Sequence, residues 1–116
     1  MAEWIFDRGG RPTLILDSDC IRNSRGQVVA WISNNSVYTM QGRHVGWFDG
    51  GVISDSRNQV LGFIRNATGS TPGRPGLAGT PGLPGFAGRP GRPGFAGAPG
   101  RPGRGGWSIE DLSAYF

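Results

Sequence analysis

The sequence predicts an all-β fold of four β-hairpins in a pseudo-fourfold arrangement, followed by a polyproline II segment and a short C-terminal helix. Two patterns lead to this prediction. Residues 4–67 divide into four blocks of sixteen that align without a gap, and residues 73–105 form eleven unbroken Gly-X-Y triplets. Because an internal repeat this regular determines the architecture, we expect a hairpin domain over 1–71, a polyproline II segment over 72–106 and a docking motif over 107–116.

Each sixteen-residue block has the pattern of a hairpin. Its seventh position holds a residue type that tolerates the left-handed backbone conformation found after a type I turn. Its second strand carries apolar side chains on both faces, so we expect this strand to be buried on both sides. The eleventh position shrinks along the chain to Gly46 and Gly62, which allows backbones to approach near a shared axis. The seventh-position residues are Gly10, Gly26, Gly42 and Asn58.

Glycine occupies every third position from Gly73 to Gly103. Only glycine fits at the axis of a collagen triple helix, so the strict period favours a trimer held by a rod that reaches on the order of 100 Å. Two other interpretations stay open. The segment could be a flexible linker, since proline and glycine are common in disordered chains, or several polyproline II segments could pack side by side through their glycines.

The chain has a net charge of +4, with twelve arginines, no lysine and eight acids. Arginine favours bidentate and stacked contacts, so the arginines and nearby aromatic rings form a candidate site for a nucleotide or nucleic acid. In the alternative interpretation the rings belong to the core and the arginines keep the proline-rich segment in solution. The candidate anion-binding residues are Arg74, Arg89, Arg92, Arg101, Arg104, Arg43, Trp31 and Trp47.

The last ten residues predict a short helix that begins with a capping box. Ser108 is the expected N-cap, and Asp111 lies near the third helical position. Ten residues cannot hold a helix alone, so this helix is expected to dock on its own domain, a neighbouring subunit or a separate protein. The candidate docking residues are Trp107, Ile109, Leu112, Tyr115 and Phe116.

The residues that usually perform catalysis or bind metal are sparse in this sequence. His44 is the sole histidine and Cys20 the sole cysteine, so no intrachain disulfide is expected and Cys20 is expected to be a small buried residue. No spacing fits a metal site, a nucleophile with its base or a phosphate loop. We therefore expect no enzyme and no cofactor. Without a signal sequence or membrane span, we expect a cytoplasmic protein, with virion delivery or unusual export left open.

The run from Gly42 to Ile53, the hairpin repeats, the proline-rich repeat and the closing Trp107 and Ser108 with a terminal aromatic together resemble the bacterial four-fold β-flower family. The resemblance covers nearly the whole chain and implies four hairpin petals around a pseudo-fourfold axis, a basic repetitive tail and a short terminal motif. It implies no activity. The strict glycine triplets depart from the basic proline repeats of the family.

These features predict a non-catalytic structural or scaffolding protein that forms a homo-oligomer, with a trimer favoured, through its Gly-X-Y segment. One alternative is an oligomeric protein that sequesters a nucleotide or another anion. A second alternative is an adapter that recruits a partner through its C-terminal helix. No membrane partner is expected.

Overall fold

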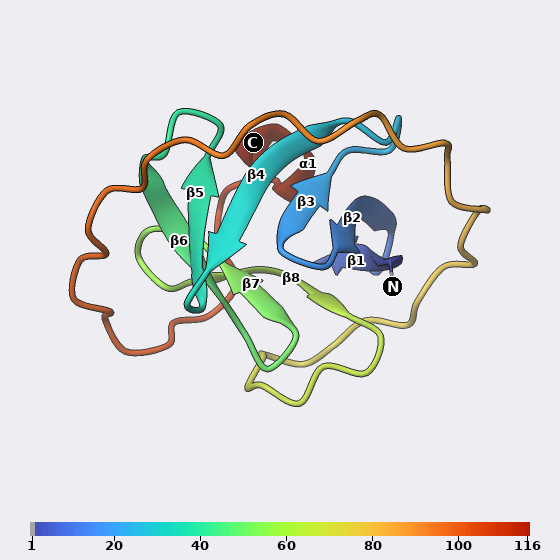
Figure 1. Cartoon of the computed structure of the whole chain (residues 1–116). Helices are drawn as coiled ribbons and strands as arrows, with labels where there is room; N and C mark the ends of the chain where they lie inside the picture. The colour runs from blue at the N-terminus through green and yellow to red at the C-terminus, as the bar shows by residue number, and fades with distance from the viewer. Residues whose placement is uncertain (1) are drawn as a thin grey trace.

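The computed structural model describes residues 2–116 as a closed barrel of eight antiparallel strands with one short helix at its end (Figure 1). Each strand pairs with its neighbours in chain order, and β8 pairs with β1 to close the barrel. The all-β prediction is therefore confirmed. The elements are β1 (Ala2–Asp7), β2 (Pro12–Asp17), β3 (Cys20–Arg22), β4 (Val28–Ser33), β5 (Ser36–Thr39), β6 (His44–Asp49), β7 (Val52–Ser54), β8 (Val60–Ile64) and α1 (Leu112–Tyr115).

The turns that join β1 to β2, β3 to β4, β5 to β6 and β7 to β8 share one design. In each, a side-chain oxygen at the start of the turn accepts hydrogen bonds from the backbone N–H groups two and four residues later, as Asp7 does from Gly9 and Arg11. The left-handed residue expected from the sequence is present in all four turns. The φ angles are +79° at Gly10, +84° at Gly26, +88° at Gly42 and +60° at Asn58.

The second and eleventh positions of each block face the barrel interior. The second positions are fully buried, and the eleventh positions are small where backbones come close. A Cβ atom on Gly46 would lie 2.0 Å from the Ser54 carbonyl oxygen, so this close approach requires glycine. Cys20 is buried, as expected. The second-position residues are Ile5, Ile21, Val37 and Ile53.

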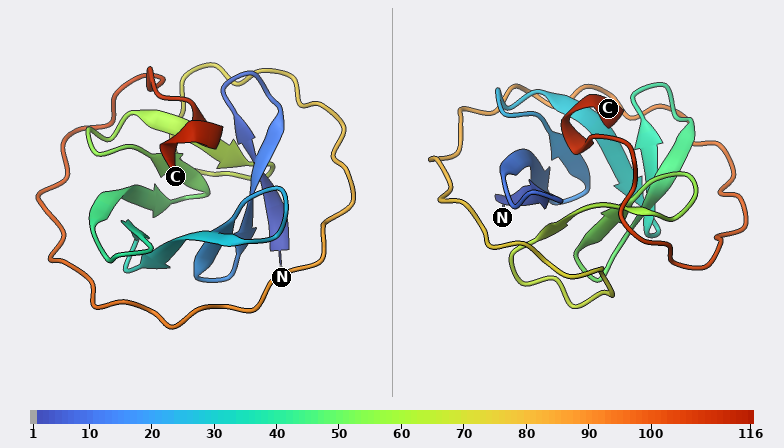
Figure 2. Two further views of the ribbon diagram at one scale, coloured as in Figure 1. Left: turned by 90° about the horizontal axis from the view of Figure 1, so that it is seen from above. Right: turned by 180° about the vertical axis from the view of Figure 1, so that it is seen from behind.

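Residues 72–106 form an extended segment that runs around the outside of the barrel, and we call this segment the belt (Figure 2). Once every nine residues a belt N–H donates to the carbonyl of a left-handed turn residue, at N···O distances of 2.9 to 3.1 Å. The belt forms no backbone hydrogen bonds within itself, so these N–H groups are free to bond to the barrel. The four pairs are Ala78 to Gly10, Ala87 to Gly26, Ala96 to Gly42 and Gly105 to Asn58.

The belt differs from the projecting rod expected from the sequence. A fully extended segment would form a rod with a length on the order of 100 Å. The largest extent of the chain is 37 Å, so this rod is not observed. The segment curves around its own barrel because its nine-residue repeat meets one sixteen-residue barrel repeat at every turn. A flexible linker is also not observed, because the belt is fixed to the barrel in every repeat.

The capping box expected at Ser108 is wrong. Helix α1 begins only at Leu112, its N-cap is Asp111, and no side chain caps it. The Ser108 hydroxyl instead donates to the buried Asp55 carboxylate at 2.6 Å and accepts from the Glu110 N–H at 3.0 Å. That contact holds Ser108 against the fourth turn and delays the helix by one turn. Within residues 2–116, no helix is long and apolar enough to cross a membrane.

Replacing a turn glycine that faces the belt should destabilise the fold. In Gly26→Ala the new Cβ would lie 2.2 Å from the Gly85 carbonyl oxygen at a φ of +84°. Backbone strain and loss of the Ala87 hydrogen bond together should lower the free energy of unfolding by roughly 2 kcal/mol, as measured by urea denaturation. Gly106→Ala is the matched control because a Cβ there meets nothing within 4 Å, and equal losses in both variants would contradict the role given to Gly26.

Candidate functional site

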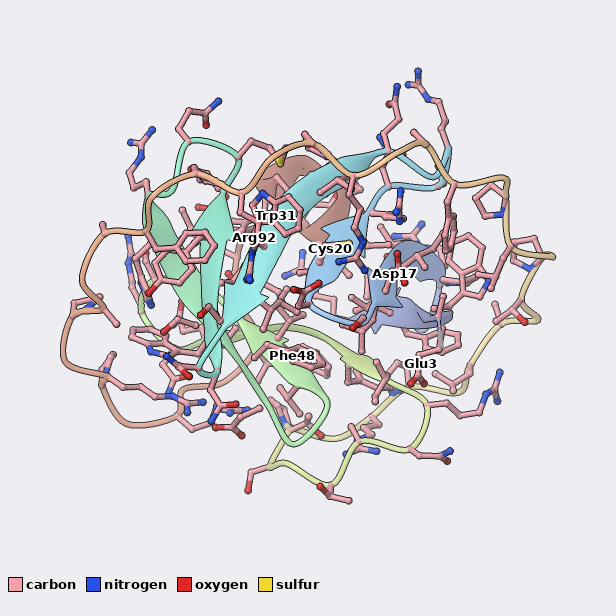
Figure 3. The ribbon with its side chains drawn as sticks, viewed as in Figure 1. Glu3, Asp17, Cys20, Trp31, Phe48 and Arg92 are labelled. Carbon is pink, nitrogen blue, oxygen red and sulfur yellow. The ribbon has the colours of Figure 1, made fainter. Side chains whose placement is uncertain are left out.

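The belt crosses four intervals between neighbouring turns, and we call each interval a seam. The first seam lies between the turns of Gly10 and Gly26, and the fourth closes the circle from Asn58 back to Gly10. In three seams a belt arginine lies over an aromatic ring of the barrel. The guanidinium-to-ring distances are 5.4 Å for Arg92 over Trp31, 5.7 Å for Arg101 over Trp47 and 5.3 Å for Arg74 over Phe63. Figure 3 shows Arg92 beside Trp31.

Belt arginines also form ion pairs with acids of the barrel. Arg89 lies 3.3 Å from Asp17 and pairs with Asp19, while Arg92 lies 3.5 Å from Asp19. Arg101 pairs with Asp49. The hydrogen bond from Arg89 is the main reason that the pKa of Asp19 lies below its ordinary value of 3.8. The positive charge of the belt is therefore largely matched by carboxylates of the same chain.

The predicted anion-binding residues do not gather into one site. The guanidinium groups of Arg74 and Arg104 donate to the carbonyl oxygens of Ala67 and Ser70, both at 2.8 Å, so each of the five belt arginines is bound to the chain itself. Arg43 is exposed on the third turn, and among residues 2–116 it has no ion pair or stacked ring.

The aromatic rings proposed for base stacking are also covered. Trp31 is 1% exposed and Trp47 is 5% exposed, so neither ring offers the open face that a nucleotide needs. Both belong to the core beneath the belt, as the alternative interpretation of the sequence held.

Sequence reasoning missed Arg22, which is 3% exposed. Its guanidinium donates to Asp17 at 2.8 Å and to the carbonyl oxygens of Gly26 and Ala87, both at 2.7 Å. The ring of Phe86 covers it at 4.4 Å. A signal was present, because Arg22 is the one charged residue in the third position of the four blocks. The hydrogen bond from Arg22 is the main cause of the lowered pKa of Asp17.

His44 lies in an aromatic cluster. Its ring centroid is 5.4 Å from that of Tyr38 and 4.8 Å from that of Trp47, while Phe95 of the belt stacks on Tyr38 at 4.3 Å. Burial lowers the pKa of His44, which favours the neutral ring. In the described part of the chain, no group of histidine, cysteine and acidic side chains could hold a metal ion.

The C-terminal residues dock on their own barrel. Leu112 is 1% exposed within the barrel core, and the Tyr115 hydroxyl donates to the Val45 carbonyl at 2.5 Å and accepts from the Ser56 N–H at 3.0 Å. Trp107 packs against Phe63 with centroids 6.2 Å apart. Phe116 is half-buried against the same core, whereas Ile109 is 78% exposed. The structure thus places four of the five candidate docking residues on the chain itself.

The family model described as 4-fold beta flower protein matches residues 3–116, which includes the barrel, the belt and the C-terminal motif. Neither curated proteins nor solved structures give a match.

The ion pairs between belt and barrel should make stability depend on pH in the acidic range. The pKa values of Asp17 and Asp19 are lowered in the folded chain. Their ionised carboxylates therefore stabilise the fold at pH values above the ordinary pKa of 3.8. This contribution is lost as the pH falls through the folded-state pKa values. Arg89→Gln should therefore lower stability at neutral pH and reduce the further loss between about pH 5 and pH 2. Urea unfolding at a series of pH values measures both effects. Parallel pH profiles would refute this assignment, and Arg25→Gln serves as the control on an exposed turn.

Removing the Tyr115 hydroxyl should loosen the end of the barrel. In Tyr115→Phe the Val45 carbonyl and the Ser56 N–H each lose a hydrogen-bond partner, which should cost about 1–2 kcal/mol of unfolding free energy. Hydrogen exchange of the Ser56 amide should also accelerate. Ser113→Ala, on an exposed residue of the same helix, should have little effect, and an unchanged Ser56 exchange rate in Tyr115→Phe would contradict the docking.

Proposed function

The chain belongs to the 4-fold beta flower family, and within this fold we propose that it is a non-catalytic structural protein that associates with copies of itself through the outward face of the belt. The observation that carries this proposal is the surroundings of the belt glycines. A Cβ atom built on any triplet glycine from Gly73 to Gly103 meets nothing within 4 Å. None of these glycines has a positive φ.

The fold of one chain therefore gives no reason for glycine at these eleven positions. The turn glycines are a contrast within the same molecule, because a Cβ on Gly10, Gly26 or Gly42 would lie within 2.2 Å of a belt carbonyl oxygen. A polyproline II segment has three residues per turn, so every third residue lies along one face. A face made of glycine allows another backbone to approach closely.

The partner that fits this face best is the belt of a second copy. Side-by-side packing of two belts keeps the four hydrogen bonds to the barrel, whereas a triple helix would require the belt to leave it at a cost on the order of 4 kcal/mol. Phe86, which is 40% exposed on the belt, adds apolar surface for such a contact. The triplet period favours three chains in this oligomer, and that number stays a prediction.

The two alternative functions have less support. Nucleotide sequestration by the belt arginines would require them to leave partners such as Asp17, Asp19 and Asp49. Recruitment of a partner by the C-terminal helix would require release of the buried Leu112. A cytoplasmic location is an expectation from the sequence.

Absolute mass measured by light scattering over a range of concentrations tests the proposal. The intact chain should form a defined oligomer, and a variant with Gly79→Ala, Gly88→Ala and Gly97→Ala should be a single chain that keeps the fold, as judged from its amide spectrum. Ala98→Ser, on an exposed belt residue, is the matched control and should associate normally. A single chain at every concentration would overturn the proposal, as would association that survives the three glycine substitutions.

A further inference from the structure

The first seam breaks the pattern of the other three. The nine-residue belt repeats begin at Gly73, Gly82, Gly91 and Gly100. The residue after this glycine is an arginine in the second, third and fourth seams and Leu83 in the first. The twelfth residue of the barrel repeat is aromatic in the second, third and fourth blocks and Ile15 in the first. The guanidinium that covers an aromatic ring in the other seams is therefore missing here, together with the ring that it would cover.

A cavity of about 300 Å³ lies at this seam, between the start of β1 and the belt. This volume is at the lower end of the range typical of small-molecule sites, ~300–1,000 Å³. Its walls come from β1, from the residues after β8 and from the belt. The residues that shape it are Glu3, Trp4, Phe6, Arg65, Pro81 and Leu83.

One wall of this cavity is apolar and held in place. The Trp4 indole N–H donates to the Pro81 carbonyl at 3.0 Å, so the ring is fixed between barrel and belt. Leu83 is 46% exposed beside it, which leaves apolar surface on the belt side. An aromatic or aliphatic group that enters the cavity would cover this surface.

The lining of the cavity also includes an arginine that forms no ion pair among residues 2–116. Arg65 occupies the fourteenth position of its block, where Asp17 and Asp49 in other blocks pair with belt arginines. Its guanidinium lies over the Phe6 ring at 5.4 Å, and among residues 2–116 no carboxylate lies within 4.0 Å of it. A guanidinium stacked in this way keeps its edge N–H groups free for a bidentate carboxylate.

Glu3 restricts the charge of the ligand. Glu3 lines the same cavity, and its carboxylate repels a dianion about twice as strongly as a monoanion. A monoanion therefore fits better than a phosphate dianion. A lining that combines Arg65 with Trp4 and Leu83 fits a molecule with both a carboxylate and an apolar body.

We propose that the first seam is a binding site for a small organic monocarboxylate with an aromatic or aliphatic body. Arg65 holds the carboxylate, and Trp4, Pro81 and Leu83 cover the body. The site depends on the contact of the belt with its own barrel and not on association between chains, so it stands independently of the proposed structural function.

Titration of the full-length chain with 3-phenylpropionate tests this site, observed through the indole N–H signal of Trp4 in ¹H–¹⁵N spectra. We expect a saturable shift with a dissociation constant on the order of 1 mM, as suits a ligand of this size. The uncharged analogue 3-phenyl-1-propanol and the dianion phenyl phosphate should bind at least about tenfold more weakly, which is the effect of losing about 1.4 kcal/mol. No saturable shift, or equal affinity for the alcohol, would overturn the proposal.

Three variants locate the site. Arg65→Gln should weaken binding of 3-phenylpropionate about tenfold, and Leu83→Arg should abolish it because arginine fills the corresponding seam elsewhere in the same chain. Arg57→Gln, on an exposed arginine of the fourth turn, should bind normally. Unchanged amide spectra elsewhere show that each variant is folded. Normal binding in Arg65→Gln, or equal weakening in Arg57→Gln, would reject the assignment.

Discussion

The structure depends on one repeated hydrogen bond, from a belt N–H to the carbonyl of a left-handed turn residue. This bond requires a positive φ in the turn, and in three turns it requires the absence of a Cβ atom, because the belt backbone passes directly over the glycine. It also requires that nine belt residues span the same arc as sixteen barrel residues. Once these conditions are met, four of the five belt arginines are brought to an aromatic ring or a carboxylate, and the C-terminal residues reach the end of the barrel.

The fold of the barrel was largely predictable, and the path of the belt was not. The sixteen-residue period predicted the strands and the left-handed turn residues, because hairpins are decided by residues close together in the chain. The Gly-X-Y period predicted an extended segment, but the same period is compatible with a triple helix, a packed bundle and a belt. The path of the belt depends on the match between its nine-residue period and the sixteen-residue period of the barrel. This match is recognised only when Ala78, Ala87 and Ala96 are compared with the turn glycines to which they bond.

The candidate site was less predictable, for similar reasons. Belt arginines without acids nearby in sequence suggested a site for anions. Their partners Asp17, Asp19 and Asp49 lie at the ends of β2 and β6 and in the turn after β2, at least 50 residues earlier in the numbering. Ser108 fits a capping box locally, but the buried Asp55 competes for its hydroxyl. Arg22 and Arg65 each differ from the other residues at their repeat position, and a comparison of the four blocks could have identified both.

The two ends of the belt meet on one ring. Arg74 near its start and Trp107 just after its end both pack on Phe63, so the belt is fastened at the same place where it begins and finishes. If one seam opened, the freed stretch would still be anchored on both sides, and its effective concentration near the barrel would remain high. Opening should therefore be brief and local, and a single break in the belt backbone would leave both halves attached.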